Sequence, residues 1–136
     1  MTLNERLLRL ALILSGLLLV VIGLNLALGG IRSMGWHMPV DFMTVTDDLL
    51  FRRHDNNVRF FGGVFFALSV LVVLAGLWPR RLRWPVVAFL LAIPAGSVFR
   101  ILAPGFDVFG DDYLAASILA ELILCPLLAL WLWRLH

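Results

Sequence analysis

The chain has 136 residues, of which 62% are hydrophobic and 15% charged, whereas soluble domains average about 45–50% apolar and about 25% charged residues. A mean hydropathy of +0.98 excludes a disordered tail, a coiled-coil rod and a nucleic-acid-binding module. All 11 basic residues are arginines, so a flexible lysine-rich arm for nucleic acid or anionic headgroups is missing. The single Cys125 allows no intrachain disulfide. We therefore predict one integral membrane domain over residues 1–136.

Four apolar stretches are each about 20 residues long, the length that a helix needs to cross the hydrocarbon core. They cover residues 8–28, 58–78, 84–104 and 113–133. Backbone groups in lipid must be hydrogen-bonded within the segment, and continuous apolar runs do not fit the alternating strands of a barrel, so these spans should be helices. Two of the three connections are short, which favours antiparallel neighbours. The predicted fold is an all-α bundle of four transmembrane helices.

The arginines outside the spans predict the orientation of the chain in the membrane. One side carries Arg6, Arg9, Arg80, Arg81, Arg83 and Arg134, and the other carries Arg32, Arg52 and Arg53. By the positive-inside rule, both termini are expected in the cytoplasm. A cleaved secretory signal peptide is the alternative for the N-terminus, but the first apolar run exceeds the roughly 7 to 15 residues of such a signal.

The long outer connection, residues 29–57, contains apolar residues at helical spacing. These residues are Phe42, Val45, Leu49 and Leu50, and they follow Pro39 and Asp41. The pattern predicts a short helix lying on the outer surface. The alternative is an irregular loop packed over the bundle.

Small and polar residues recur at intervals of four in the last two spans. The third span has Ala88, Ala92, Gly96 and Arg100, and the fourth has Tyr113, Ser117, Glu121 and Cys125. Small residues let membrane helices approach closely, and a charge needs a polar partner away from lipid. At about 1.5 Å per residue, Arg100 and Glu121 differ in depth by about 6 Å, which an arginine side chain can span. We predict that they form an ion pair or face one wet cavity.

Polar residues of the other two spans fall in the same outer half of the bilayer. The resulting candidate ligand-binding residues are Asn25, Asn57, Arg59, Arg100 and Glu121. Such residues often only hold helices together, at about 0.6 kcal/mol per hydrogen bond. Contributions from all four spans favour a pocket for a small amphiphile or lipid, in which Arg59 and Arg100 meet its anionic or carbonyl end.

Two other functions stay open at this point. Glu121 is the candidate catalytic residue of a membrane enzyme, as an acid or base acting on a hydrophobic substrate. An accessory subunit of a larger membrane complex is the other alternative. No histidine lies in a span, so we predict no metal site and no cofactor. The expected partners are membrane lipids, an amphiphilic small molecule and, through the Ala/Gly faces, a second copy in a homodimer, with no nucleic acid.

Three features of the sequence resemble a known family. They are the segment Asn57-Val58-Arg59-Phe60-Phe61-Gly62-Gly63, Arg100 late in the third span, and Glu121 within Leu119-Ala120-Glu121-Leu122. Together they resemble a bacterial four-span family catalogued as domain of unknown function 4345, over nearly the whole chain. The resemblance implies an inner-membrane helical bundle, similar in layout to DoxX-like proteins, and supplies no activity. The Asp-rich stretch 105–112 departs from typical members.

Overall fold

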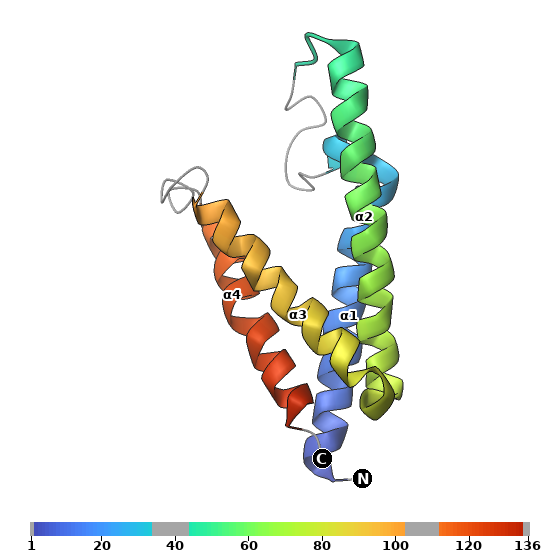
Figure 1. Cartoon of the computed structure of the whole chain (residues 1–136), viewed down its shortest axis with the longest axis vertical. Coiled ribbons are helices and arrows are strands. Elements are labelled where there is room, and N and C mark those ends of the chain that lie inside the picture. The colour runs from blue at the N-terminus through green and yellow to red at the C-terminus, as the bar shows by residue number, and fades with distance from the viewer. Residues whose placement is uncertain (1, 34–43, 103–111, 135–136) are drawn as a thin grey trace. The chain divides into compact units, whose positions relative to one another are not determined.

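The computed structural model describes residues 2–33, 44–102 and 112–134, which are almost entirely helical (Figure 1). The elements are α1 (Leu3–Gly29), a 3-10 turn η1 (Gly30–Ser33), α2 (Asp48–Leu77), α3 (Pro79–Leu102) and α4 (Asp112–Trp133). All four α-helices are long and apolar enough to cross a membrane. The predicted all-α fold with four transmembrane helices is confirmed, and the chain is a multi-pass membrane protein.

Local caps determine where the first two helices begin and end. Thr2 Oγ1 accepts a hydrogen bond of 3.2 Å from Glu5 N at the start of α1, and Asp47 Oδ1 accepts one of 3.0 Å from Leu50 N at the start of α2. α1 ends at Gly29, and the next residue, Gly30, has a φ of 64°, the left-handed conformation that favours glycine. Because the starting caps lie in polar sequence, α1 and α2 begin ahead of the predicted starts at residues 8 and 58.

The helix predicted on the outer surface is placed differently from our expectation. Leu49 and Leu50 belong to the first turn of α2, because the Asp47 cap begins this helix directly at Asp48. Val45 precedes the helix in a non-helical segment. The remaining residues of that pattern, 39–42, lie outside the described residues, as does the predicted end of the third span at residue 104.

The chain divides into two compact units. The α1/α2 unit contains residues 14–73, and the α3/α4 unit contains residues 1–13 and 74–136. The single domain over residues 1–136 stays a prediction.

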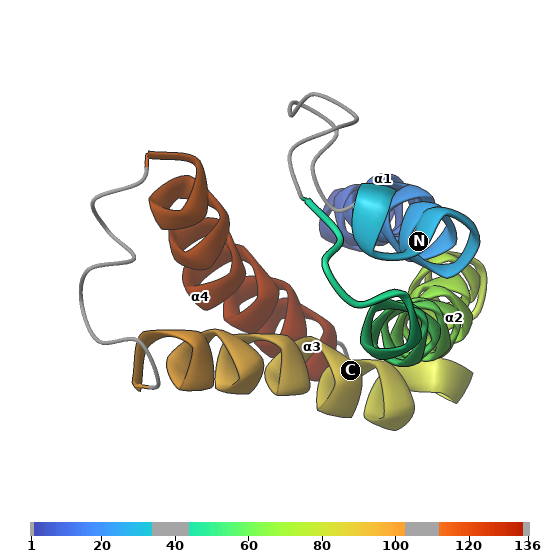
Figure 2. The ribbon, with the colours of Figure 1, turned by 90° about the horizontal axis from the view of Figure 1, so that it is seen from above.

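In the α1/α2 unit, the two helices run antiparallel at close range (Figure 2). A Cβ atom added at Gly16 would lie 2.7 Å from the backbone nitrogen of Val73, and one at Gly23 would lie 2.6 Å from that of Phe66. Only hydrogen fits at these positions, so the glycines let the two backbones touch, as small residues do in membrane helix pairs. The expected antiparallel packing of these neighbours is confirmed.

In the α3/α4 unit, α3 and α4 pack against each other (Figures 1 and 2). Its largest fully buried side chains are Leu8, Leu12, Val86, Leu90, Ile118 and Leu132. Trp131 Nε1 donates to Asn4 Oδ1 at 3.0 Å, and Arg9 Nη1 donates to the Leu77 carbonyl at 3.0 Å. These bonds tie the start of α1 to the end of α4 and to the end of α2.

Candidate functional site

Glu121 is the centre of a polar cluster between α3 and α4. Arg100 Nη1 lies 3.1 Å from Glu121 Oε1 and 3.0 Å from Oε2. Ser117 Oγ donates to Oε1 at 3.1 Å, and Ser97 Oγ donates to Oε2. These four hydrogen bonds match the roughly four lone-pair sites of an ionised carboxylate. The predicted pairing of Arg100 with Glu121 is confirmed, and the carboxylate is saturated by groups of its own two helices.

Arg100 keeps hydrogen-bond donors that Glu121 does not use. Within the described part of the chain, only Nη1 is engaged, which leaves the N–H groups of Nε and Nη2. The Arg100 side chain is 42% exposed, against 29% for that of Glu121. One turn earlier on the same helix face, a Cβ atom added at Gly96 would meet nothing within 4 Å. Among the described residues, Glu121 therefore holds a guanidinium that keeps donors without a partner, and the position of Gly96 on the same helix face is open.

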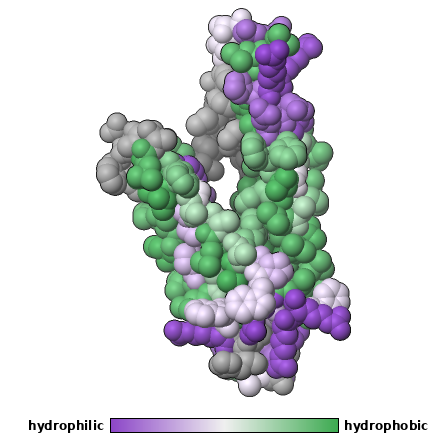
Figure 3. Space-filling view, in the orientation of Figure 1, coloured by the Kyte–Doolittle hydropathy of each residue, from purple (hydrophilic) through white to green (hydrophobic). Residues whose placement is uncertain are grey.

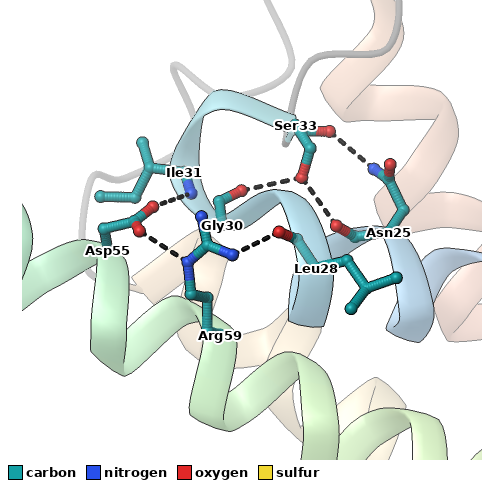
Figure 4. Close-up of polar contacts among 7 residues, drawn as sticks. All are labelled: Asn25, Leu28, Gly30, Ile31, Ser33, Asp55 and Arg59. Atoms are coloured by element: carbon teal, nitrogen blue, oxygen red, sulfur yellow. Dashed lines mark hydrogen bonds and ion pairs between the residues drawn. The ribbon is translucent and has the colours of Figure 1, made fainter.

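A second polar cluster joins α2 to the end of α1 (Figure 4). Arg59 Nε donates to Asp55 Oδ2 at 2.7 Å, and Arg59 Nη1 donates to the Leu28 carbonyl. The other carboxylate oxygen, Asp55 Oδ1, accepts a hydrogen bond of 2.8 Å from Ile31 N. The last carbonyls of a helix have no partner within that helix. Arg59 supplies one here, so the pair connects α2 to both the last turn of α1 and the turn η1.

Asn25 closes the turn η1 back onto α1 in the same cluster. Its Nδ2 donates to the Ser33 carbonyl at 2.8 Å, and Ser33 Oγ lies 2.9 Å from both the Asn25 and the Gly30 carbonyls. Figure 4 shows these bonds beside those of Arg59 and Asp55. The contacts of Asn25 therefore fix the path of the chain as it leaves α1.

The structure brings the predicted site residues together in two groups. Arg100 and Glu121 meet in the α3/α4 unit. In the α1/α2 unit, Asn25 bonds to Ser33 of η1, and Arg59 bonds to the Leu28 carbonyl at the end of α1. Asn57 lies exposed on α2. The sequence predicts a single polar site with residues from all four spans. Whether the two groups belong to one site stays a prediction.

Four side chains of these clusters were not among the predicted site residues: Ser33, Asp55, Ser97 and Ser117, of which Ser117 was already placed on the polar stripe of the fourth span. Asp55 precedes Arg59 by four residues and Ser97 precedes Arg100 by three, which are the spacings at which side chains meet on one helix face. That spacing could have identified both Asp55 and Ser97 from the sequence. Ser33 could not be identified in this way, because its hydrogen bonds depend on the turn of the chain at Gly30.

A hollow of about 280 Å³ lies at the start of α2. Its lining residues are Ile31, Thr44, Val45, Thr46, Asp47, Leu50, Phe51 and His54. None of the five predicted ligand-binding residues lines it, although the Ile31 amide is bonded to Asp55 in the second cluster. No group of three or more His, Cys, Asp or Glu side chains that could hold a metal ion occurs within the described ranges.

Comparison with known sequences finds one family. The sequence model described as "Domain of unknown function (DUF4345)" matches residues 7–132, a region that contains both polar clusters. No curated protein and no solved structure matches the chain. The resemblance that the three motifs indicated is thereby confirmed.

Proposed function

This membrane protein belongs to the family described as domain of unknown function DUF4345, and we propose that it binds a small amphiphile or lipid whose anionic or carbonyl group is bound by Arg100. One observation carries the proposal. The Glu121 carboxylate is saturated by four hydrogen bonds and fixes Arg100 through Nη1 alone, and Nε and Nη2 have no partner among the described residues. A fixed guanidinium with unused donors is suited to oxygen atoms of a ligand.

The membrane setting makes such a group selective for amphiphiles. An unpaired charge costs about 2.5–3.5 kcal/mol at the centre of a membrane helix and less toward its ends, and Glu121 reduces this cost by balancing the charge of Arg100 in the last turn of α3. The N–H groups of Arg100 that have no partner among the described residues need acceptors, since lipid tails have none. A ligand headgroup supplies them, while its apolar tail packs along the exposed positions Ala92, Gly96 and Phe99 of α3.

The same geometry weighs against Glu121 as a catalytic acid or base. A general base needs a lone pair directed at the substrate proton, and both Glu121 oxygens already accept two hydrogen bonds each. Proton transfer would first have to break the contact with Arg100 or with one serine. Glu121 is better suited to positioning Arg100.

Asn25, Asn57 and Arg59 remain proposed ligand contacts of secondary weight. The hydrogen bonds of Asn25 and Arg59 already give both residues a structural role. Asn25 holds η1 against α1, and Arg59 joins α2 to the last turn of α1. The proposed location is the bacterial inner membrane with both termini in the cytoplasm, which the distribution of arginines along the sequence supports.

The test is native mass spectrometry of the full-length protein released from mild detergent. We expect the wild type to carry an added amphiphile mass that is lost in Arg100→Ala and retained in Arg52→Ala, which removes an exposed arginine of α2. The double variant Arg100→Gln with Glu121→Gln leaves no unpaired charge and should also lose the ligand. A ligand-free wild type, equal retention in all variants, or a co-purifying protein in place of the amphiphile would contradict the proposal.

A further inference from the structure

We propose that Glu121 makes the Arg100 site selective for the carbonyl group of an uncharged amphiphile, such as a fatty-acyl ester, over an anionic headgroup. This inference rests on the proposed function and names the class of its ligand. Glu121 is then a specificity-determining residue that acts through its charge, although the ligand itself contacts Arg100.

The charge of Arg100 is already balanced before any ligand binds. A guanidinium alone favours an anion, because its hydrogen bonds to carboxylate or phosphate are its strongest. Here Arg100 Nη1 lies 3.1 Å and 3.0 Å from the two oxygens of Glu121. An anion at Nε or Nη2 would share the guanidinium with Glu121 and leave the cluster with a net negative charge. A neutral carbonyl oxygen accepts from the same N–H groups and keeps the balance.

The last two spans supply no second cation that could balance a bound anion. Arg100 is the only basic residue between residues 84 and 133 of the sequence. The acidic residues in the same stretch are Asp107, Asp111, Asp112 and Glu121. Asp107 and Asp111 lie outside the described residues, and their charge can only add to the negative side. Arg83 precedes Arg100 by 17 residues on α3, about 26 Å along the helix, which is too far to contact the same headgroup.

The surroundings of the cluster are apolar, so repulsion between like charges is strong there. Glu121 lies seven residues beyond Leu114, where the membrane-spanning part of α4 begins, which is about 10 Å along the helix. Ser97, which donates to Glu121, is fully buried. Figure 3 shows mainly hydrophobic side chains over the upper and middle parts of α3 and α4. Water screens charges far better than an apolar environment does, so the Glu121 charge disfavours an anion here.

The groups of the cluster also require that the ligand brings an acceptor. Arginine side chains can only donate hydrogen bonds, and the hydroxyl groups of Ser97 and Ser117 donate to Glu121. A carbonyl oxygen has two lone pairs and no hydrogen to place, so it fits donors of this kind without leaving a polar group unpaired. The exposed apolar side chains of Phe99 and Leu102, on either side of Arg100 in α3, are suited to contact with the hydrocarbon chain.

The experiment titrates full-length protein in mild detergent with methyl oleate or, at alkaline pH, with oleate, and measures the bound amphiphile by native mass spectrometry. The wild type should bind methyl oleate roughly 10-fold more tightly than oleate. Glu121→Gln keeps the size of the side chain and removes its charge, so it should reverse this preference. Ser117→Ala removes one hydrogen bond to the same carboxylate and keeps the charge, so it should retain the wild-type preference.

Failure of the proposed function and failure of this inference give different results. Binding of both probes to Arg100→Ala as tightly as to the wild type would refute the proposed function. Binding that depends on Arg100 but favours oleate, or shows no preference, would leave that function standing and overturn the selectivity. An unchanged preference in Glu121→Gln would do the same.

A second pair of probes tests the selectivity without any variant of Glu121. If Glu121→Gln does not fold, the wild type is titrated with dioleoylglycerol and with dioleoylphosphatidic acid, which share their acyl chains and differ in the phosphate. The wild type should bind dioleoylglycerol more tightly. Equal or tighter binding of the phosphatidic acid would overturn the inference.

Discussion

Arg100 reaches Glu121 through one nitrogen, with Nη1 3.1 Å from Oε1 and 3.0 Å from Oε2. A forked contact would engage two guanidinium nitrogens instead of one. The single-nitrogen contact leaves two donor-bearing nitrogens, Nε and Nη2, without a partner among the described residues. The pair therefore balances its charges while two guanidinium nitrogens of Arg100 keep N–H donors without a partner among the described residues.

Glu121→Ala should lower the free energy of unfolding by less than the about 2.5–3.5 kcal/mol of a charge at the centre of a membrane helix, because it leaves the charge of Arg100 unpaired in the last turn of α3. Arg100→Gln with Glu121→Gln should be less destabilised than Glu121→Ala, since no charge is left alone. Equilibrium denaturation in mixed micelles measures both. Equal losses in the single and the double variant would show that charge pairing does not set the stability of this cluster.

Two adjacent glycines of α2 give opposite expectations for the same substitution. A Cβ atom at Gly62 would lie 2.5 Å from the backbone nitrogen of Ala27, whereas one at Gly63 would meet nothing within 4 Å. Gly62→Ala should therefore cost about 1–3 kcal/mol through overpacking, and Gly63→Ala should be neutral or stabilising by about 0.4–1 kcal/mol. Thermal unfolding in detergent compares them. Similar midpoints for the two variants would contradict the close approach of α1 and α2.

The existence of the four helices could be predicted from hydropathy, because the length of each apolar run is set by the bilayer. The residues at which the helices start could not be predicted from hydropathy, because they depend on capping side chains in the polar segments before each apolar run. Asp47 begins α2 in a stretch where the apolar pattern indicated a separate helix, and Thr2 begins α1 ahead of the predicted span.

The partners of charged residues were predictable only in part. Depth along the helices was enough to pair Arg100 with Glu121, because both lie in apolar spans where few alternatives exist. The same reasoning grouped Arg59 with these residues as a ligand contact, yet its bonds go to Asp55 and to the Leu28 carbonyl. A backbone carbonyl carries no sequence signal, so a bond of this kind is found only from the structure.

Asp55→Ala should expose the amide of Ile31 to solvent exchange. That amide donates to Asp55 Oδ1 at 2.8 Å, and Arg59 loses its carboxylate partner in the same variant. Hydrogen–deuterium exchange of peptides covering residues 30–33 should rise well above wild type, while Asn57→Ala, at an exposed position two residues later, should leave exchange unchanged. Protection that survives Asp55→Ala would assign the order of η1 to the bonds of Asn25 and Ser33 alone.

The orientation of the chain is tested by labelling engineered cysteines from one side of the membrane. Arg53 and Leu77 lie on α2, 24 residues or about 36 Å apart, which is enough to cross the hydrocarbon core, and Arg81 follows Leu77 at the start of α3. In a Cys125→Ser background, Arg53→Cys should react with a membrane-impermeant maleimide in intact cells after the outer membrane is made permeable. Arg81→Cys should react only after the inner membrane is opened as well. The reverse pattern would show that the arginine distribution does not set the topology of this protein.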